Sequence, residues 1–189
     1  MLRDPGDRAR APEPLRLVQA FVNTLDIENG IEELESPAAL ERALAEIGVP
    51  VEGPRLDASD LATALAAREA LRSLALANNG VLVDEHQLET LDRIAAAARL
   101  TVRFDGQRAE LVPQEHGLAG ALGTILAAVH EGMTDGTWWR LKACPRGICH
   151  WVFYDRSRNG SGKWCAMSVC GNRVNTKTYR RRLARDSTA

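Results

Sequence analysis

The sequence lacks any long apolar segment. Hydrophobic residues make up 45% of its 189 residues, yet no apolar run approaches the roughly 20 residues that span a bilayer. The first ten residues are charged, and no apolar signal core follows them. Because secretion signals and membrane spans both need such a core, we expect a protein without a membrane partner. We place it in the reducing cytoplasm, at the nucleoid if it binds DNA.

The sequence also lacks the patterns on which most enzymes depend. It contains no glycine-rich phosphate loop and no evident nucleophile–base pair, and its four histidines are scattered without metal-ligand spacing. No internal repeat is evident either. Because a catalytic centre needs a set of such groups within reach of one another, we expect no enzymatic activity.

Cysteine is scarce, and all four cysteines lie close together. They form two C-x4-C pairs, Cys144/Cys149 and Cys165/Cys170, separated by fifteen residues. Disulfides are rare in a reducing cytosol, whereas two such pairs can each supply two corners of a tetrahedral zinc site. We therefore predict a structural zinc ion, with disulfides or plain thiols as alternatives. Four thiolates leave no open position for catalysis, and we expect no ligand role for the neighbouring His150.

Acidic residues are scarce at the C-terminal end. Residues 139–189 contain twelve Lys and Arg against two acidic residues, which leaves twelve basic and 23 acidic residues for positions 1–138. Such an asymmetry is typical of a polyanion-binding tail on an acidic body. Alternatively, the tail folds back onto that body. A tail that binds polyanions and also folds back would give an autoinhibited state.

Hydrophobic periodicity predicts a mainly α protein with small β elements (α+β). We expect a disordered leader over 1–13 and a helical regulatory domain over 14–137. Ser36 and Asp84 are suitable N-caps for two of its helices. Alternating residues around Asp105-Gly106 indicate one β-hairpin, 100–104 with 108–112. The expected helices span 15–25, 36–47, 58–77, 84–99 and 117–131.

Two arginines fall on the apolar stripe of the expected helix 58–77. A buried guanidinium needs a carboxylate or a bound anion as partner. We favour an internal ion pair or a side chain that reaches the rim for Arg68 and Arg72. The alternative is a pocket for an anionic small ligand.

Residues 138–189 are predicted to form a compact ββα-like module. Strands are expected over 138–142 and 151–154, followed by a basic loop over 156–163 and a helix over 169–185. Basic side chains on one face of a helix, with amides near base edges, are typical of nucleic-acid contacts. A solvated basic helix is the alternative. The predicted nucleic-acid-binding residues are Arg156, Arg158, Lys163, Asn172, Arg173, Lys177, Arg180, Arg181 and Arg182.

The segment Cys170-Gly-Asn-Arg173 resembles the signature of the CGNR zinc finger. Phe153-x-Asp155-x-Ser-Arg-Asn159, Trp164-Cys-x-Met167 and the Tyr179-Arg-Arg-Arg182 tail extend this resemblance over about 45 residues. It implies that the four cysteines bind Zn²⁺ in a DNA-binding element. The acidic part resembles the helical ABATE domain, which is associated with stress-induced transcriptional regulation. Asn23-Thr24 and Arg68-Glu69 are similar to recurring residues of that domain.

These observations lead to one hypothesis and one alternative. The hypothesis is a bacterial-type transcriptional regulator that binds duplex DNA through its zinc finger. Its helical domain would dimerise or sense a small ligand, in a pocket that includes Asn23, Thr24, Arg68 and Arg72. The alternative is a zinc-stabilised protein-interaction or RNA-binding module.

Overall fold

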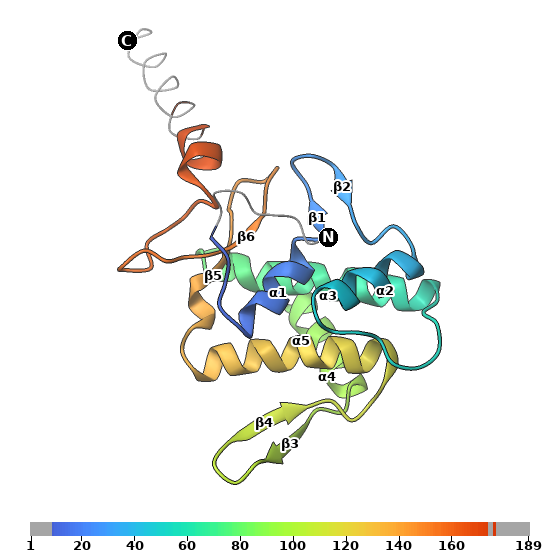
Figure 1. The fold of residues 1–189 in the computed structure, drawn as a ribbon. Coiled ribbons are helices and arrows are strands. Elements are labelled where there is room, and N and C mark those ends of the chain that lie inside the picture. Colours follow the sequence, from blue (N-terminus) through green and yellow to red (C-terminus); the bar gives the residue numbers. More distant parts are fainter. Residues whose placement is uncertain (1–8, 174–175, 177–189) are drawn as a thin grey trace, which may run out of the picture.

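The structure is a computed structural model and describes residues 9–173 and residue 176. Five α-helices and three antiparallel strand pairs make up most of this part (Figure 1), which confirms the α+β class. The helices are α1 (Leu15–Val22), α2 (Pro37–Glu46), α3 (Ala58–Ala77), α4 (Glu85–Ala97) and α5 (Gly117–Thr134). The strand pairs are β1 (Leu25–Asp26) with β2 (Ile31–Glu32), β3 (Thr101–Phe104) with β4 (Ala109–Val112), and β5 (Leu141–Ala143) with β6 (Val152–Tyr154).

Local capping signals set several helix starts. The Ser36 hydroxyl accepts from the Ala39 N–H at 3.2 Å, and the Asp84 carboxylate accepts from the His86 N–H at 3.1 Å. Both bonds satisfy donors that the first helical turn leaves unpaired. The predicted caps are therefore confirmed.

The apolar helix α5 lies at the centre of the main core, as its sequence predicts. It contacts α1, α3 and α4, and Leu122 and Ile125 are fully enclosed. Gly132 allows α1 to approach closely, because an added Cβ would lie 2.6 Å from Leu15 Cδ2. A larger residue at this position would force the two helices apart.

Two short strand pairs extend from the helices. The predicted hairpin β3–β4 projects from the body (Figure 1), with Phe104 77% exposed. The pair β1–β2 was not predicted. Helix α1 ends at Val22 rather than near Leu25, and the chain turns at Thr24, whose hydroxyl donates to the Phe21 carbonyl at 2.8 Å.

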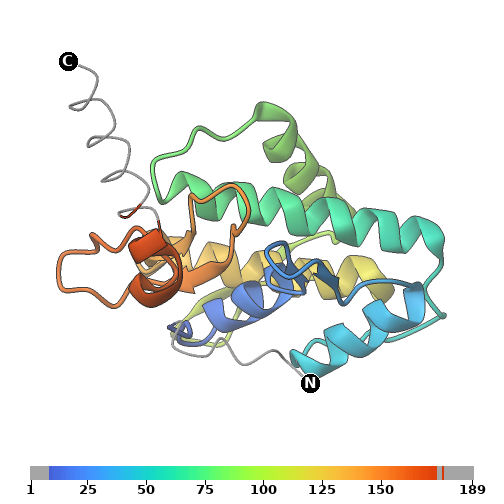
Figure 2. The same cartoon turned by 90° about the horizontal axis from the view of Figure 1, so that it is seen from above.

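The hairpin β5–β6 joins two cores. Leu141, Ala143 and Val152 belong to the main core, whereas Trp151 and Phe153 pack with the four cysteines in a second, smaller core. The part of the chain after the predicted division at 137/138 therefore packs directly against the helical domain. In Figure 2 the cysteine module lies against one end of the helical domain.

Two sequence-based boundaries need correction. The strand expected from Trp138 begins only at Leu141, because Trp138–Arg140 forms a 3₁₀ turn. Residues 9–13, assigned to a disordered leader, are held in place: Ala11 is 4% exposed, and the Ala9 carbonyl accepts from the Tyr154 N–H at 3.1 Å. Composition indicated disorder because it cannot show a partner that lies far along the chain.

Candidate metal centre and its basic surroundings

Four buried cysteines meet at one point. Cys144 follows β5 and Cys149 precedes β6, while Cys165 precedes a short π-helical turn, Met167–Gly171, and Cys170 lies within it. Their sulfur atoms all lie within 4.8 Å of one another. Within the described residues, the group that could hold a metal ion here consists of these four cysteines and does not include His150.

The sulfur spacing fits a tetrahedral zinc site. With Zn–S bonds near 2.3 Å, the edges of a regular tetrahedron measure about 3.8 Å. The Cys149–Cys165 and Cys165–Cys170 sulfur pairs are 3.7 and 3.6 Å apart. A disulfide would bring two sulfurs to about 2.05 Å. The donor set and its geometry are thus those of a structural Zn²⁺ site, and the disulfide alternative does not fit.

The cluster favours negative charge on the Cys144 sulfur and disfavours it on the Cys149 sulfur. Hydrogen bonds from Cys149 and then Cys165 lower the pKa of the Cys144 thiol to about 4, and the same contacts raise the pKa of Cys149. Arg146 lies 3.6 Å from the Cys170 sulfur. This contact, together with Glu28, raises the pKa of Arg146. A cation beside the sulfurs offsets part of the −2 formal charge of a four-thiolate zinc complex.

A buried ion pair organises the loop between the two cysteine pairs. Lys142 Nζ donates to Asp155 at 2.8 Å, and also to the carbonyls of Gly160 and Gly162. Asp155 accepts in turn from the backbone N–H groups of Ser157 and Gly162. Burial opposes the charge of Asp155, but its hydrogen bonds outweigh burial and hold its pKa below the usual range. The basic loop is therefore anchored at both ends.

Sequence reasoning missed Lys142. The only signal was a lysine between two apolar residues in a predicted strand. Its side chain is 6% exposed and that of Asp155 is 3% exposed. The pair could have been suggested from the two residues together, since Asp155 is one of two acids in the basic tail.

The predicted nucleic-acid-binding residues divide into three groups. Arg156, Arg158 and Lys163 are exposed on the loop, with Lys163 Nζ 5.8 Å from the Trp164 ring centroid. Asn172 and Arg173 are exposed directly after the last cysteine. The remaining four, Lys177, Arg180, Arg181 and Arg182, lie outside the described residues, as does most of the predicted helix 169–185.

Arg173 and Arg146 share one partner on the helical domain. Glu28, in the β1–β2 turn, accepts from Arg146 at 2.9 Å and also from Arg173. Burial would raise the pKa of Glu28, but the two guanidiniums outweigh it and lower the pKa. The arginine of the Cys-Gly-Asn-Arg segment is thus linked to the acidic body.

The residues suggested for a ligand pocket form an internal network. Arg68 forms a bidentate salt bridge with Glu32, at 2.6 and 2.7 Å. Its Nε also donates to Glu69 at 2.9 Å. Thr24 lies 3.3 Å from Arg68 Nη1. Burial lowers the pKa of Arg72, whose guanidinium contacts Glu69 at 3.0 Å. These contacts are those of the internal ion pair that the sequence analysis favoured.

The same network ties the helical domain to the zinc module. Arg72 also donates to the carbonyls of Val22 and His150, at 2.8 and 3.0 Å. The Asn23 amide both donates to and accepts from the Val152 backbone, each at 2.8 Å. These side chains supply backbone partners to β6 and to the end of the first cysteine pair.

The end of α3 adds a second set of such contacts. Asn78 donates to the carbonyls of Trp138 and Leu141, both at 2.9 Å. Asn79 donates to the carbonyls of Ala143 and Lys163, at 3.0 and 2.8 Å. The helix expected over 58–77 ends just before this Asn-Asn-Gly segment, to which the sequence analysis assigned no role. Its long-range role has no local signal.

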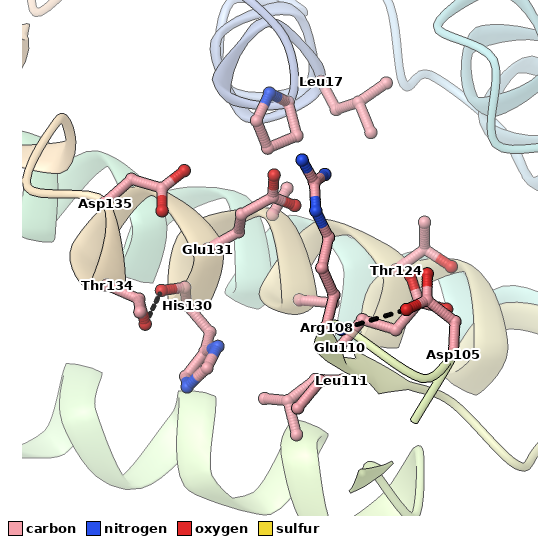
Figure 3. A pocket seen from close by; sticks show the side chains of 14 residues that line it. Leu17, Asp105, Arg108, Glu110, Leu111, Thr124, His130, Glu131, Thr134 and Asp135 are labelled. Atoms are coloured by element: carbon pink, nitrogen blue, oxygen red, sulfur yellow. Dashed lines mark hydrogen bonds between the residues drawn. The ribbon is translucent and has the colours of Figure 1, made fainter. Parts of the chain in front are cut away.

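A groove of about 640 Å³ lies elsewhere, between α1, β4 and α5 (Figure 3). Its polar lining is largely acidic, with Asp105, Glu110, Glu131 and Asp135 around Arg108. None of the four residues suggested for the ligand pocket lines this groove. Across the described ranges, no helix combines the length and apolar character that a membrane crossing requires.

Comparison with known families adds to this geometry. Residues 15–136 match the model of the ABATE family, described as "Putative stress-induced transcription regulator". The chain belongs to the ABATE family. Residues 140–183 match the CGNR zinc finger, in the predicted order. No curated protein matches the chain.

This ABATE-family chain thus joins a regulator domain to a zinc finger. The two matched segments meet between Gly136 and Arg140, where α5 passes into β5. The four cysteines all fall inside the finger segment. The chain is a zinc-finger protein of a transcription-regulator family, with Zn²⁺ as its structural cofactor.

Proposed function

We propose that this protein regulates transcription by binding duplex DNA through its CGNR finger. The observation that carries the proposal is the set of exposed cations fixed around a rigid centre. Arg156, Arg158 and Lys163 stand on a loop that Lys142 and Asp155 anchor. Asn172 and Arg173 follow the last zinc-binding cysteine.

The rigid support increases the value of these cations for binding. Side chains that are already positioned lose less freedom on association. Each phosphate contact releases condensed counterions, so affinity should fall steeply with salt, with a slope near −0.9 per contact on duplex DNA. The net charge of the last fifty residues supports this electrostatic mode.

We further propose that the helical domain controls the finger through ligand binding or dimerisation. An anionic ligand at Asn23, Thr24, Arg68 and Arg72 would compete with Glu32 for Arg68. Because Asn23 and Arg72 also hold the backbone around β6, such a ligand would shift the finger. Dimerisation would double the DNA site, since one short helix reads too few bases for genomic specificity.

Fluorescence anisotropy with random duplex DNA at several salt concentrations tests the DNA proposal. The variant Arg173→Ala/Lys177→Ala/Arg181→Ala removes three cations from the finger. The matched variant Arg42→Ala/Arg55→Ala/Arg108→Ala removes three exposed cations from the helical domain. We expect steep salt dependence and a large loss of affinity only in the first variant. Absence of binding at low salt with stoichiometric zinc, or equal losses in both variants, would overturn the proposal.

A second candidate function is single-stranded RNA binding. It is favoured by two tryptophans beside cations: the Arg140 guanidinium lies 4.5 Å from the Trp139 ring centroid, and Lys163 lies over Trp164. Aromatic rings next to cations are typical of surfaces that stack unpaired bases. In the same assay, a preference for single-stranded RNA over duplex DNA would favour this candidate.

A further inference from the structure

Three separate segments of the chain border a shallow hollow on the finger. Its volume is about 460 Å³, and it is lined by Pro12, Arg140, Tyr154, Arg156, Ser157 and Arg158. Three of these six residues are arginines and none is acidic. A concave surface with three positive charges and no carboxylate favours an anion.

The side chain of Arg140 is held in place by two backbone carbonyls and an aromatic ring. Its Nη1 donates to the carbonyls of Asp155 and Ser157, both at 2.8 Å, and its guanidinium lies over the Trp139 ring. In the described part of the chain, both hydrogen bonds use Nη1. The Nε and Nη2 groups are therefore available as a pair of parallel donors, the geometry that binds phosphate oxygens best.

The surrounding loop keeps this charge from being neutralised. Asp155 is adjacent in sequence, but its carboxylate points inward to Lys142 and is 3% exposed. Arg156 is fixed at the rim by a 2.9 Å bond from Nη2 to the Arg10 carbonyl. Trp139 packs so tightly against the loop that a Cβ on Gly160 would lie 1.9 Å from its ring.

The acidic groove in Figure 3 provides the internal contrast. There, Arg108 is surrounded by carboxylates, so an anion would meet repulsion. The two hollows differ in charge although both are lined by arginine. Of these two hollows, only the one on the finger has arginines and no acidic residue in its lining.

We infer that the hollow between Arg140, Arg156 and Arg158 binds a phosphate group of a nucleic-acid backbone. This inference rests on the proposed function and deepens it, because it names the contact and adds Arg140 to the predicted residues. Phosphate chemistry is shared by nucleic-acid backbones and by small phosphate compounds. The test therefore includes one arm for each source.

The first arm measures duplex DNA binding by the full-length zinc-loaded protein. Arg156→Ala/Arg158→Ala is compared with Arg55→Ala/Arg108→Ala, which removes two exposed cations from the helical domain. We expect the first variant to lose about tenfold in affinity at moderate salt and its salt slope to fall by about 1 per lost contact. The control should stay near wild type. Arg158→Ala alone removes an exposed side chain, so a folding defect in the double variant would not hide the effect.

The second arm measures pyrophosphate binding by titration calorimetry with the same proteins. Weak binding that the double variant loses, together with the DNA effect, supports the inference. Loss of pyrophosphate binding with unchanged DNA affinity would assign the hollow to a small phosphate ligand and overturn it. DNA binding that is equal in the double variant and its control would overturn the inference but leave the proposed function standing. No DNA binding by the wild type would overturn both.

Discussion

The two cores of this molecule are held together by different forces. The main core consists of enclosed apolar side chains such as Phe21, Leu40, Leu71 and Ile125. The second core consists of four cysteines with Trp151 and Phe153. Burial of apolar surface stabilises the first in proportion to its area, whereas the second is too small to fold on that basis and depends on its metal.

The hairpin β5–β6 contributes residues to both cores. Its inward residues Leu141, Ala143 and Val152 pack on the helices, and its alternate residues face the loop and the cysteines. Side chains at Asn23, Arg72 and Asn79 complete its hydrogen bonding. The finger therefore packs on the helical domain, and we expect the helical domain to stay folded without the metal.

Removal of zinc should have the largest effect of the changes considered. It should unfold the second core and leave the main core folded. A chelator, or Cys170→Ser, should abolish stoichiometric zinc and the protection of residues 144–150 and 163–171 from amide hydrogen exchange. The metal contributes about 10–16 kcal/mol in isolated zinc-finger peptides, which is an upper limit here. Helices α3 and α5 should retain protection.

Metal analysis and hydrogen-exchange mass spectrometry measure the two parts separately. Ser161→Ala, on the exposed loop next to the site, should keep full zinc occupancy. If α3 and α5 lose protection together with the finger, the two cores are one cooperative unit and the comparison is wrong.

Breaking the buried ion pair should be the next largest effect. Lys142→Met leaves the Asp155 carboxylate buried without its cation, which typically costs about 3–5 kcal/mol. Because the pKa of Asp155 is lowered in the folded state, its ionised carboxylate adds to the free energy of unfolding at pH values above the ordinary pKa of an aspartate. This contribution is lost as pH falls through the pKa of the folded state.

Urea unfolding at neutral and acidic pH checks both statements. The wild type should lose stability on acidification. Lys142→Met should lose less, because the substitution has already removed the ion pair that stabilises the Asp155 carboxylate. Lys142→Met/Asp155→Leu should recover part of the loss at neutral pH, since an apolar pair often replaces an ion pair at little cost. A double variant less stable than Lys142→Met would argue against an uncompensated charge as the cause.

Removing one docking amide should have a moderate effect. Asn23→Ala takes away both partners that the amide gives to the Val152 backbone. Unsatisfied buried polar groups cost about 1–3 kcal/mol. The Val152 carbonyl keeps a bond from Gln19 at 3.1 Å, so a value in the lower half of that range is expected. Thermal unfolding should show it, with Asn29→Ala in the β1–β2 turn as the control.

The contrast between cores also explains what the sequence could predict. Helix starts at Ser36 and Asp84, and each C-x4-C cysteine pair, depend on residues a few positions apart, so local patterns were sufficient. Docking depends on pairs such as Asn23 with Val152, which lie 129 positions apart. The two-residue strands β1 and β2 are too short to show alternation.

The candidate site divides in the same way. The sequence analysis could predict Arg156, Arg158 and Lys163 as binding residues, because a loop of polar residues faces solvent. All three are exposed in the structure. The sequence could not show that Arg140 and Pro12 meet this loop, since neither is near it in the chain. It also could not show Glu28 as the partner of Arg173.

The last prediction concerns the charge link between the two regions. Glu28 draws Arg173 and Arg146 toward the helical domain, so a DNA phosphate must compete with this carboxylate for Arg173. Glu28→Gln keeps the shape but removes the charge. Partly exposed ion pairs are worth about 0.2–1 kcal/mol, so DNA affinity should rise by up to about fivefold, in the anisotropy assay used for the wild type.

Glu35→Gln provides the matched control, because it removes one exposed acid from the same region without such a contact in the described part of the chain. If the loss of any negative charge from the helical domain were sufficient, the affinity for DNA would rise equally in both variants. Zinc content must stay stoichiometric in Glu28→Gln, since Arg146 also touches the Cys170 sulfur. An affinity equal to that of Glu35→Gln would mean that Glu28 fixes the finger in position and does not restrain its binding. A gain confined to Glu28→Gln would show that the acidic domain limits DNA binding through this one carboxylate.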